Sequence, residues 1–129
     1  MIEKRLLRPD RARKIAGSFA AIEHRFLREG FWAELSHHEL ILYLFLILVG
    51  DRHGLSYYSY DRICSLTSLL ADEYILARDG LIHKDLIAFD GRLFQVLSLP
   101  CGSRTDRATV RQLIHQSLGE DHDHKTHRF

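Results

Sequence analysis

Residues 68–84 read SLLADEYILARDGLIHK, and this stretch decides the fold. Tyr74, Ala77 and Leu81 recur at i, i+3 and i+7, which places them on one face of a helix. Gly80 weakens a helix by roughly 1 kcal/mol relative to alanine, yet the pattern runs past it, so we predict that the helix continues to the end of the stretch. Its outer face shows carboxylates and aliphatic side chains: Asp72, Glu73, Ile75, Leu76 and Asp79.

Two more helices are predicted upstream of this stretch. The motif SHHE at residues 36–39 is a capping box, in which the serine hydroxyl accepts from the third helical N–H and the glutamate reaches back. Residues 40–49 are apolar on every side, so we predict a fully buried central helix that ends near Gly50. This run is too short for a membrane span, which needs about 20 residues. Ser59 is a second N-cap candidate and opens a short helix that ends at Thr67-Ser68.

Strands are predicted on both sides of the helices. Residues 18–27 are expected to form a short strand that leads into a turn at residues 28–30. Residues 85–89 and 92–98 flank Asp90-Gly91, and Asp-Gly between two apolar runs is a strong hairpin signal. A type I′ turn is expected there, which needs positive φ at both central residues.

The chain divides into three predicted parts. Residues 1–17 form a basic arm, which either contacts phosphates or is a solvated, partly helical lead-in. Residues 18–118 form one domain, and residues 119–129 form a His-rich tail that we expect to be disordered. The last helix of the domain begins near Ser103, with Val110, Leu113, Ile114 and Leu118 on one face and Arg104, Arg107 and Arg111 on another.

Composition fits a folded domain. The chain has 129 residues, of which 46% are hydrophobic and 27% charged. Because the net charge is only +1, any affinity for nucleic acid must come from a local cluster of charges. The N-terminus is charged and resembles no signal peptide, and Cys64 and Cys101 share no metal-type spacing. We therefore expect reduced thiols and a cytoplasmic protein.

Three short patterns carry a resemblance to a known family: FWAELS at residues 31–36 with Tyr43 after it, Ser59-Tyr60 with Ile63, and DLI at residues 85–87. Over about residues 18–99 the chain resembles the winged helix-turn-helix domains at the N-terminus of plasmid replication initiators and related bacterial regulators. The resemblance implies an α+β fold, a helix bundle with a two-stranded wing and here an extra C-terminal helix. It also implies that the helix at residues 68–84 approaches the major groove of DNA.

The resemblance places the candidate DNA contacts on this helix, the wing and the arm: Ser68, Asp72, Glu73, Lys84, Arg92, Arg13 and Lys14. Carboxylates can accept from cytosine N4 but repel phosphates, so Lys84 at the helix end and Arg92 after the hairpin turn would have to supply phosphate contacts. We predict a DNA-binding protein, a transcription or replication-associated regulator whose partner is double-stranded DNA. A homodimer is expected, because one short helix rarely gives enough specificity.

The alternative is a winged-helix interaction module that no longer binds DNA. In that case Ile75 and Leu76 would contact a protein partner, since exposed apolar patches mark interfaces. Three tyrosines precede the second predicted helix. We expect packing for Tyr60, whereas Tyr57 and Tyr58 are open to packing or to a partner surface.

Other chemistry finds little support in the sequence. The tail histidines His122, His124 and His127 lack a scaffold that would fix metal geometry, so no metal site is expected. Cys64 has no identifiable base and is interpreted as a packing residue. Phosphate-binding loops and nucleophile motifs are missing, so we expect neither a cofactor nor an enzyme.

Overall fold

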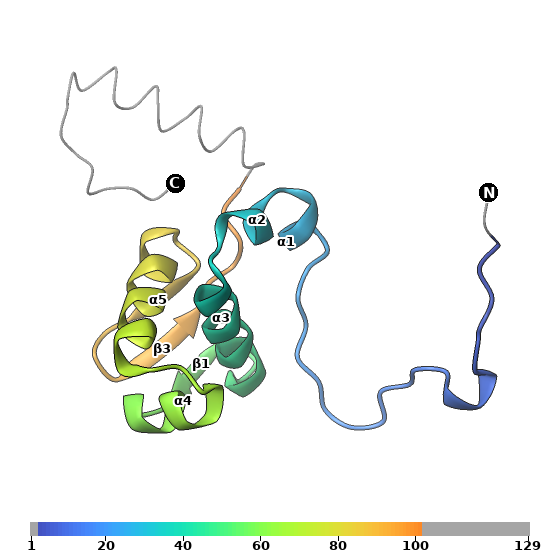
Figure 1. The fold of residues 1–129 in the computed structure, drawn as a ribbon, viewed down its shortest axis with the longest axis horizontal. Coiled ribbons are helices and arrows are strands. Elements are labelled where there is room, and N and C mark those ends of the chain that lie inside the picture. Colours follow the sequence, from blue (N-terminus) through green and yellow to red (C-terminus); the bar gives the residue numbers. More distant parts are fainter. Residues whose placement is uncertain (1–2, 102–129) are drawn as a thin grey trace, which may run out of the picture.

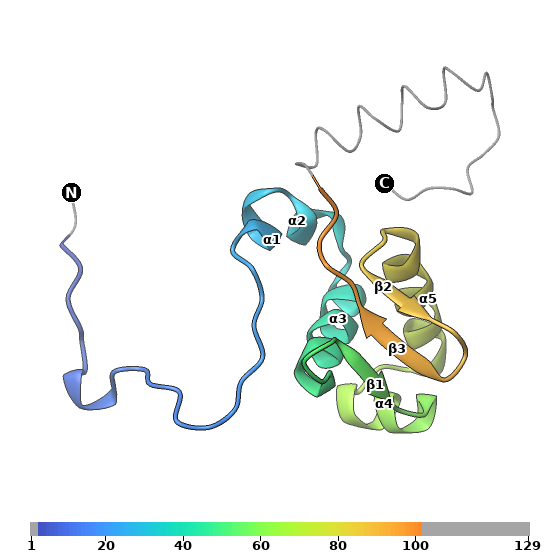
Figure 2. The same cartoon turned by 180° about the vertical axis from the view of Figure 1, so that it is seen from behind.

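Helices α3, α4 and α5 and a small antiparallel sheet form the body of the molecule (Figure 1). The computed structural model describes residues 3–101. Its elements in chain order are the 3-10 turn η1 (Pro9–Arg11), α1 (Arg25–Arg28), α2 (Phe31–Glu34), α3 (His37–Val49), β1 (Leu55–Tyr57), α4 (Tyr60–Thr67), α5 (Ala71–His83), β2 (Ile87–Phe89) and β3 (Leu93–Val96). From behind, the sheet lies against α3 and α5 (Figure 2).

Helix α3 begins at the predicted capping box. The Glu39 N–H donates to Ser36 Oγ over 3.2 Å, and the Ser36 N–H donates to the Glu39 carboxylate over 2.9 Å. The prediction of a helix buried on every side is wrong for one face: Ile41, Leu44 and Leu48 are 41%, 48% and 64% exposed. These residues lie at i, i+3 and i+7, whereas α5, α4 and β3 pack against the other side of the helix.

Helices α4 and α5 form the predicted helix-turn-helix. Ser59 Oγ accepts from the Arg62 N–H over 3.3 Å, as expected for an N-cap, and Ser68 ends α4 with a left-handed φ of 63°. In α5 the three residues Tyr74, Ala77 and Leu81 are buried, and the helix continues beyond Gly80. Both predictions for this stretch are confirmed.

Gly80 is required by a long-range contact. A Cβ at this position would overlap the carboxylate of Glu39, which lies against the backbone of α5. The helix therefore carries a residue of low helix propensity because a buried side chain of α3 occupies the space.

The sheet contains the predicted hairpin and one strand that the sequence did not reveal. Its strand order is β1-β3-β2, and both pairings are antiparallel. The turn differs from the expected type I′, since only Gly91 has a positive φ, of 103°. Asp90 instead shapes the turn through its carboxylate, which accepts from the backbone N–H groups of Arg92 and Leu93 over 2.9 and 2.8 Å.

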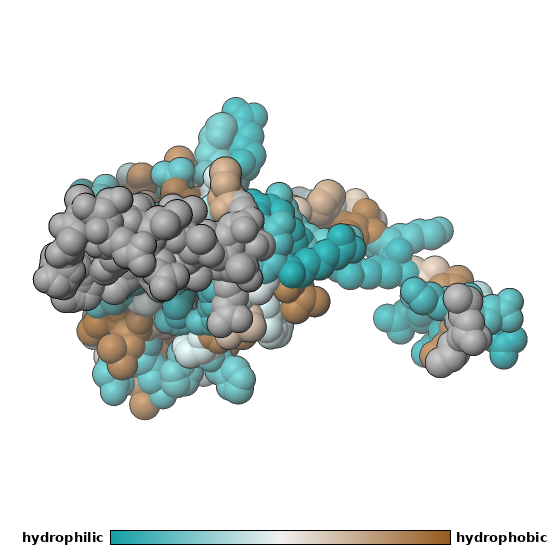
Figure 3. Space-filling view, turned by 90° about the horizontal axis from the view of Figure 1, so that it is seen from above, coloured by the Kyte–Doolittle hydropathy of each residue, from teal (hydrophilic) through white to brown (hydrophobic). Residues whose placement is uncertain are grey.

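The expected strand at residues 18–27 is wrong, because α1 occupies the end of this segment and no described strand precedes α3. The sheet of β1, β3 and β2 is formed entirely by residues that follow α3. The helical turn buries Phe26 against Phe31 and Tyr43, with ring centroids 6.2 and 5.2 Å away. Residues 3–24, which include the described part of the basic arm, extend away from the body (Figures 1 and 3), and hydrophilic residues predominate along them.

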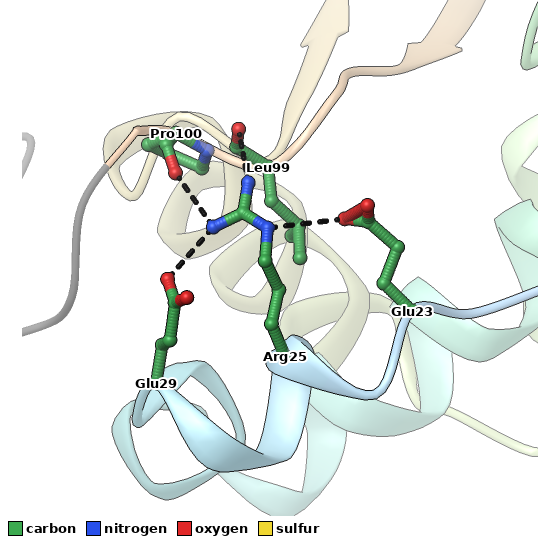
Figure 4. Close-up of polar contacts among 5 residues, drawn as sticks. All are labelled: Glu23, Arg25, Glu29, Leu99 and Pro100. Carbon is green, nitrogen blue, oxygen red and sulfur yellow. Dashed lines mark hydrogen bonds and ion pairs between the residues drawn. The ribbon is translucent and has the colours of Figure 1, made fainter.

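Arg25 fastens α1 to the chain that follows β3 (Figure 4). Its guanidinium donates to the carbonyl oxygens of Leu99 and Pro100 over 2.9 and 3.1 Å. It also pairs with the carboxylates of Glu29 at 2.8 Å and Glu23 at 3.4 Å. This cluster holds the short N-terminal helices against the body.

The core is one cluster between the three main helices and the sheet. Its fully buried members are Phe31, Leu42, Leu46, Ile63, Leu81, Leu86, Ile87 and Phe94. The order helix, strand, helix-turn-helix and hairpin is consistent with a winged-helix-like α+β fold. Within residues 3–101 no helix has the length and apolar character to cross a bilayer. The expected last helix from Ser103 and the tail at 119–129 lie outside the described residues.

Candidate nucleic-acid interface

The outer face of α5 is acidic and apolar at its exposed positions. Asp72 and Asp79 are exposed, together with Ile75 at 43% and Leu76 at 72% exposure. Glu73 is less accessible, because its carboxylate accepts from the Leu70 N–H over 2.9 Å and lies 3.6 Å from the His38 imidazole. Glu73 thus caps the helix on which it was predicted to contact bases.

Lys84, the predicted phosphate contact at the end of α5, faces α3. Its ammonium group forms an ion pair with the partly buried carboxylate of Glu39. A phosphate contact by Lys84 would have to replace this pair, and removing one partner of such a pair leaves an uncompensated charge. Lys84 therefore has a structural partner, which the sequence did not indicate.

The remaining predicted contacts are exposed but do not form one cluster. Ser68 occupies the turn between α4 and α5, and Arg92 follows the tip of the β2–β3 turn. Arg13 and Lys14 belong to the arm, which leaves the body on the side of α3 away from α5 (Figures 1 and 2). The structure thus keeps the arm apart from the helix-turn-helix face.

A groove of about 800 Å³ lies between α5, the start of α4 and the β2–β3 turn. Its lining includes Tyr57, Tyr60, Tyr74, Ile75, Arg78 and Arg92. Among the described residues that line it there is no aspartate or glutamate. The groove therefore combines aromatic rings with two arginines, of which Arg78 is paired with Asp79 over 3.1 Å.

Arg78 is held in place within this groove. Its guanidinium lies over the rings of Tyr74 and Phe89, 5.5 and 5.3 Å from their centroids. Burial lowers the pKa of Arg78, but hydrogen bonds to Tyr74 and Asp79 outweigh this and raise the pKa above its usual value. The side chain is a fixed, permanently charged group, which costs less entropy to use than a free arginine.

Arg78 was not among the residues predicted to contact DNA, although the sequence contains one signal for it. Arg78 follows Tyr74 at i+4, a spacing at which side chains meet on a helix surface. The second ring, Phe89, comes from β2, and the helix pattern alone could not reveal that contact.

The tyrosines near α4 differ from the expectation in which of them pack and which are exposed. Tyr58 packs edge-on against Phe45 at 5.4 Å. Tyr60, expected to pack, is 51% exposed and touches Tyr74 at 6.1 Å between centroids, and Tyr57 is 67% exposed. Tyr60 therefore packs as expected against Tyr74, but about half of the residue is exposed.

Other candidate chemistry was examined at the cysteines and histidines. Cys64 packs against the core, and desolvation and the charge of Asp61 raise the pKa of its thiol, the opposite of what activates a nucleophile. In the part of the chain that the structure describes, no group of three His, Cys, Asp or Glu side chains could hold a metal ion. His122, His124 and His127 lie outside this part.

Comparisons with known proteins found one structural neighbour. No family model matches the chain, and no curated protein matches it. The chain is similar to a solved structure described as the N-terminal domain of a DNA binding protein, with 14% identity and a TM-score of 0.48. The match covers 81% of this chain and 90% of that one.

Proposed function

We propose that this protein binds DNA through the face that α5 and the β2–β3 turn share, and that it acts as a transcription or replication-associated regulator. The observation that carries the proposal is the groove on this face, whose lining has no carboxylate and includes Arg92, which has no ion pair among the described residues, and Arg78, which is paired with Asp79. Phosphates supply most of the nonspecific affinity for DNA, so a cationic groove beside a helix-turn-helix favours this partner.

The acidic face of α5 limits how a duplex can approach. Asp72 and Asp79 would repel phosphates if the helix lay centrally against the backbone. An approach tilted toward the β2–β3 turn would place Arg92 at a phosphate and leave Asp72 to meet a base edge, where a carboxylate can accept from cytosine N4. Arg13 and Lys14 in the arm would add phosphate contacts to a neighbouring stretch of DNA.

Binding to a mixed-sequence duplex across a salt series tests the proposal. Log affinity falls with log salt by about 0.9 for each phosphate contact, so Arg92→Ala should weaken binding and make the slope shallower by about one contact. Arg28→Ala is the matched control, because Arg28 is an exposed arginine on α1. Absence of duplex binding even at low salt, where nonspecific attraction is strongest, would reject duplex DNA as the partner.

A protein partner is the second candidate, favoured by the 72% exposure of Leu76 on α5. Leu76→Lys separates the two candidates. If the outer face of α5 meets DNA, the added charge should strengthen duplex binding several-fold and steepen its salt dependence. If that face meets a protein instead of DNA, neither the unmodified chain nor Leu76→Lys should bind the duplex. Dimer formation remains a prediction.

A further inference from the structure

We infer that the groove between α5 and the β2–β3 turn takes unpaired nucleotides, so that the protein binds single-stranded DNA there by stacking bases on Tyr57 and Tyr60. The inference rests on the proposed function, because it keeps DNA as the partner and the same groove as the site. It adds a preferred form of DNA and two residues that duplex binding would not require.

The first observation is the exposure of aromatic rings at the groove. Tyr57, at the end of β1, is 67% exposed, and Tyr60, the first residue of α4, is 51% exposed. Both line the groove. Exposed aromatic side chains on which bases stack are a general device for binding single strands without reading sequence, since every base has a π-face.

The second observation is the placement of positive charge beside these rings. Arg78 is fixed between Tyr74 and Phe89, and it is paired with the Asp79 carboxylate over 3.1 Å. Arg92 is exposed and forms no ion pair with the described residues. A strand whose bases stack on the tyrosines would therefore have the uncompensated charge of Arg92 available to its phosphates in the same groove.

The third observation separates a single strand from a duplex. Asp72 and Asp79 are exposed on α5 and do not line the groove, although Asp79 is paired with Arg78 over 3.1 Å. A duplex laid across α5 would bring phosphates close to both carboxylates, whereas a single strand in the groove need not cross the face that carries Asp72. Aromatic grooves also bind proline-rich peptides, but two arginines without a lining carboxylate favour an anionic ligand.

The groove is large enough for such a ligand. Its volume of about 800 Å³ falls within the range of about 300–1,000 Å³ that is typical of ligand sites. Its lining offers exposed tyrosine rings and guanidinium groups, which are the groups that the bases and the phosphates of a strand can contact.

The test measures the affinity of the full chain for a fluorescent 12-nucleotide deoxythymidine strand, for a duplex of the same length and for an abasic strand. Tyr57→Leu and Tyr60→Leu remove a ring but keep apolar bulk, and Trp32→Leu is the control, because Trp32 is a 53% exposed aromatic on α2. Base stacking on an aromatic is worth about 1–3 kcal/mol, so each groove variant should weaken single-strand binding about 5- to 150-fold. Trp32→Leu should change it less than twofold, and duplex binding should change less than threefold in all three variants. Circular dichroism and urea unfolding confirm that each variant is folded.

The outcomes separate this inference from the proposed function. Single-strand binding that depends on the bases and on both tyrosines supports the inference. If the chain binds the duplex but its single-strand binding does not depend on the tyrosines, the inference is overturned and the proposed function stands. If the unmodified chain binds neither the duplex nor the single strand, both are overturned. The inference would also be overturned if a labelled proline-rich peptide bound in a way that depends on Tyr57 and Tyr60 while the single strand did not bind.

Discussion

At the scale of single residues, Glu39 connects two predictions that the sequence made separately. The capping box around Glu39 and the continuation of α5 through Gly80 were each predicted from local patterns and are confirmed. The same carboxylate also fills the space above Gly80 and forms the ion pair with Lys84. Glu39 and Lys84 are 45 residues apart in sequence, and local periodicity carries no information on such contacts.

Gly80→Ala should therefore lower the free energy of unfolding, whereas glycine-to-alanine substitutions in helices usually raise it. In an ordinary helix this change stabilises by about 1 kcal/mol, but here the new Cβ displaces Glu39 from its capping and ion-pair partners. We expect destabilisation by about 1–2 kcal/mol, the typical loss when a cap and its hydrogen bonds are broken. The measurement is urea unfolding followed by circular dichroism.

A second background provides the control for Gly80. In a Glu39→Ala protein the space above Gly80 is empty, so adding Gly80→Ala should stabilise by up to about 1 kcal/mol. The same sign in both backgrounds would show that Glu39 does not determine the choice of glycine.

Because Tyr43 is buried, we expect the free energy of unfolding to fall at alkaline pH. Burial and the carboxylate of Glu23 raise its pKa to about 12, whereas tyrosine in an unfolded chain titrates near 10. As the pH rises, the tyrosine loses its proton in the unfolded state before it does so in the folded state. The free energy of unfolding is therefore unaffected below pH 10 and falls by at most about 3 kcal/mol as the pH rises toward 12. Urea unfolding at pH 8, 10 and 11 measures the slope. Tyr43→Phe should flatten it, and an equally steep slope in that variant would disprove the assignment.

At the scale of elements, patterns that are complete within one segment were predicted well. The three main helices and the hairpin have local signals in their caps and periodicity, and all four are present. The strand β1 was missed because it has three residues and is defined by its pairing with β3. The strand expected at residues 18–27 was wrong for a related reason, since apolar residues in a short run do not reveal whether they pair in a sheet or pack as a helical turn, as Phe26 does against Phe31 and Tyr43.

The short helix α1 should depend on Arg25. Arg25→Met removes its hydrogen bonds to the carbonyl oxygens of Leu99 and Pro100, and we expect a loss of about 1–3 kcal/mol in unfolding free energy. Hydrogen exchange should become faster at amides of α1. Arg28→Met is the control on the same helix, because Arg28 is exposed. Equal effects of the two substitutions would mean that the cluster around Arg25 adds nothing specific.

At the scale of the whole molecule, nearly neutral net charge conceals an uneven distribution. Positive charge lies in the arm and at the groove, whereas Asp72 and Asp79 lie on the outer face of α5. The sequence placed Arg92 after the hairpin turn and carboxylates on the outer face of the helix at residues 68–84, and Arg92, Asp72 and Asp79 are exposed. It could not predict the groove, because Tyr57, Arg78 and Arg92 come from three elements that only the fold brings together.

The arm should contribute to binding without contributing to folding. Residues 3–17 have no buried side chain, so removing residues 1–17 should change the unfolding free energy by less than about 0.5 kcal/mol. The truncated chain should bind duplex DNA with a shallower salt dependence, because Arg13 and Lys14 are lost. An unchanged salt slope would identify the arm as a solvated lead-in.

The most direct test of the account is to map the DNA-binding surface by backbone amide chemical shifts. DNA is added to the isotope-labelled full chain at low salt. We expect the shifts to concentrate at the groove, at Ser59, Arg78, Gly91 and Arg92, with small changes at Arg28. Shifts confined to the arm, or no shifts at saturating DNA, would contradict the claim that the groove between α5 and the β2–β3 turn binds nucleic acid.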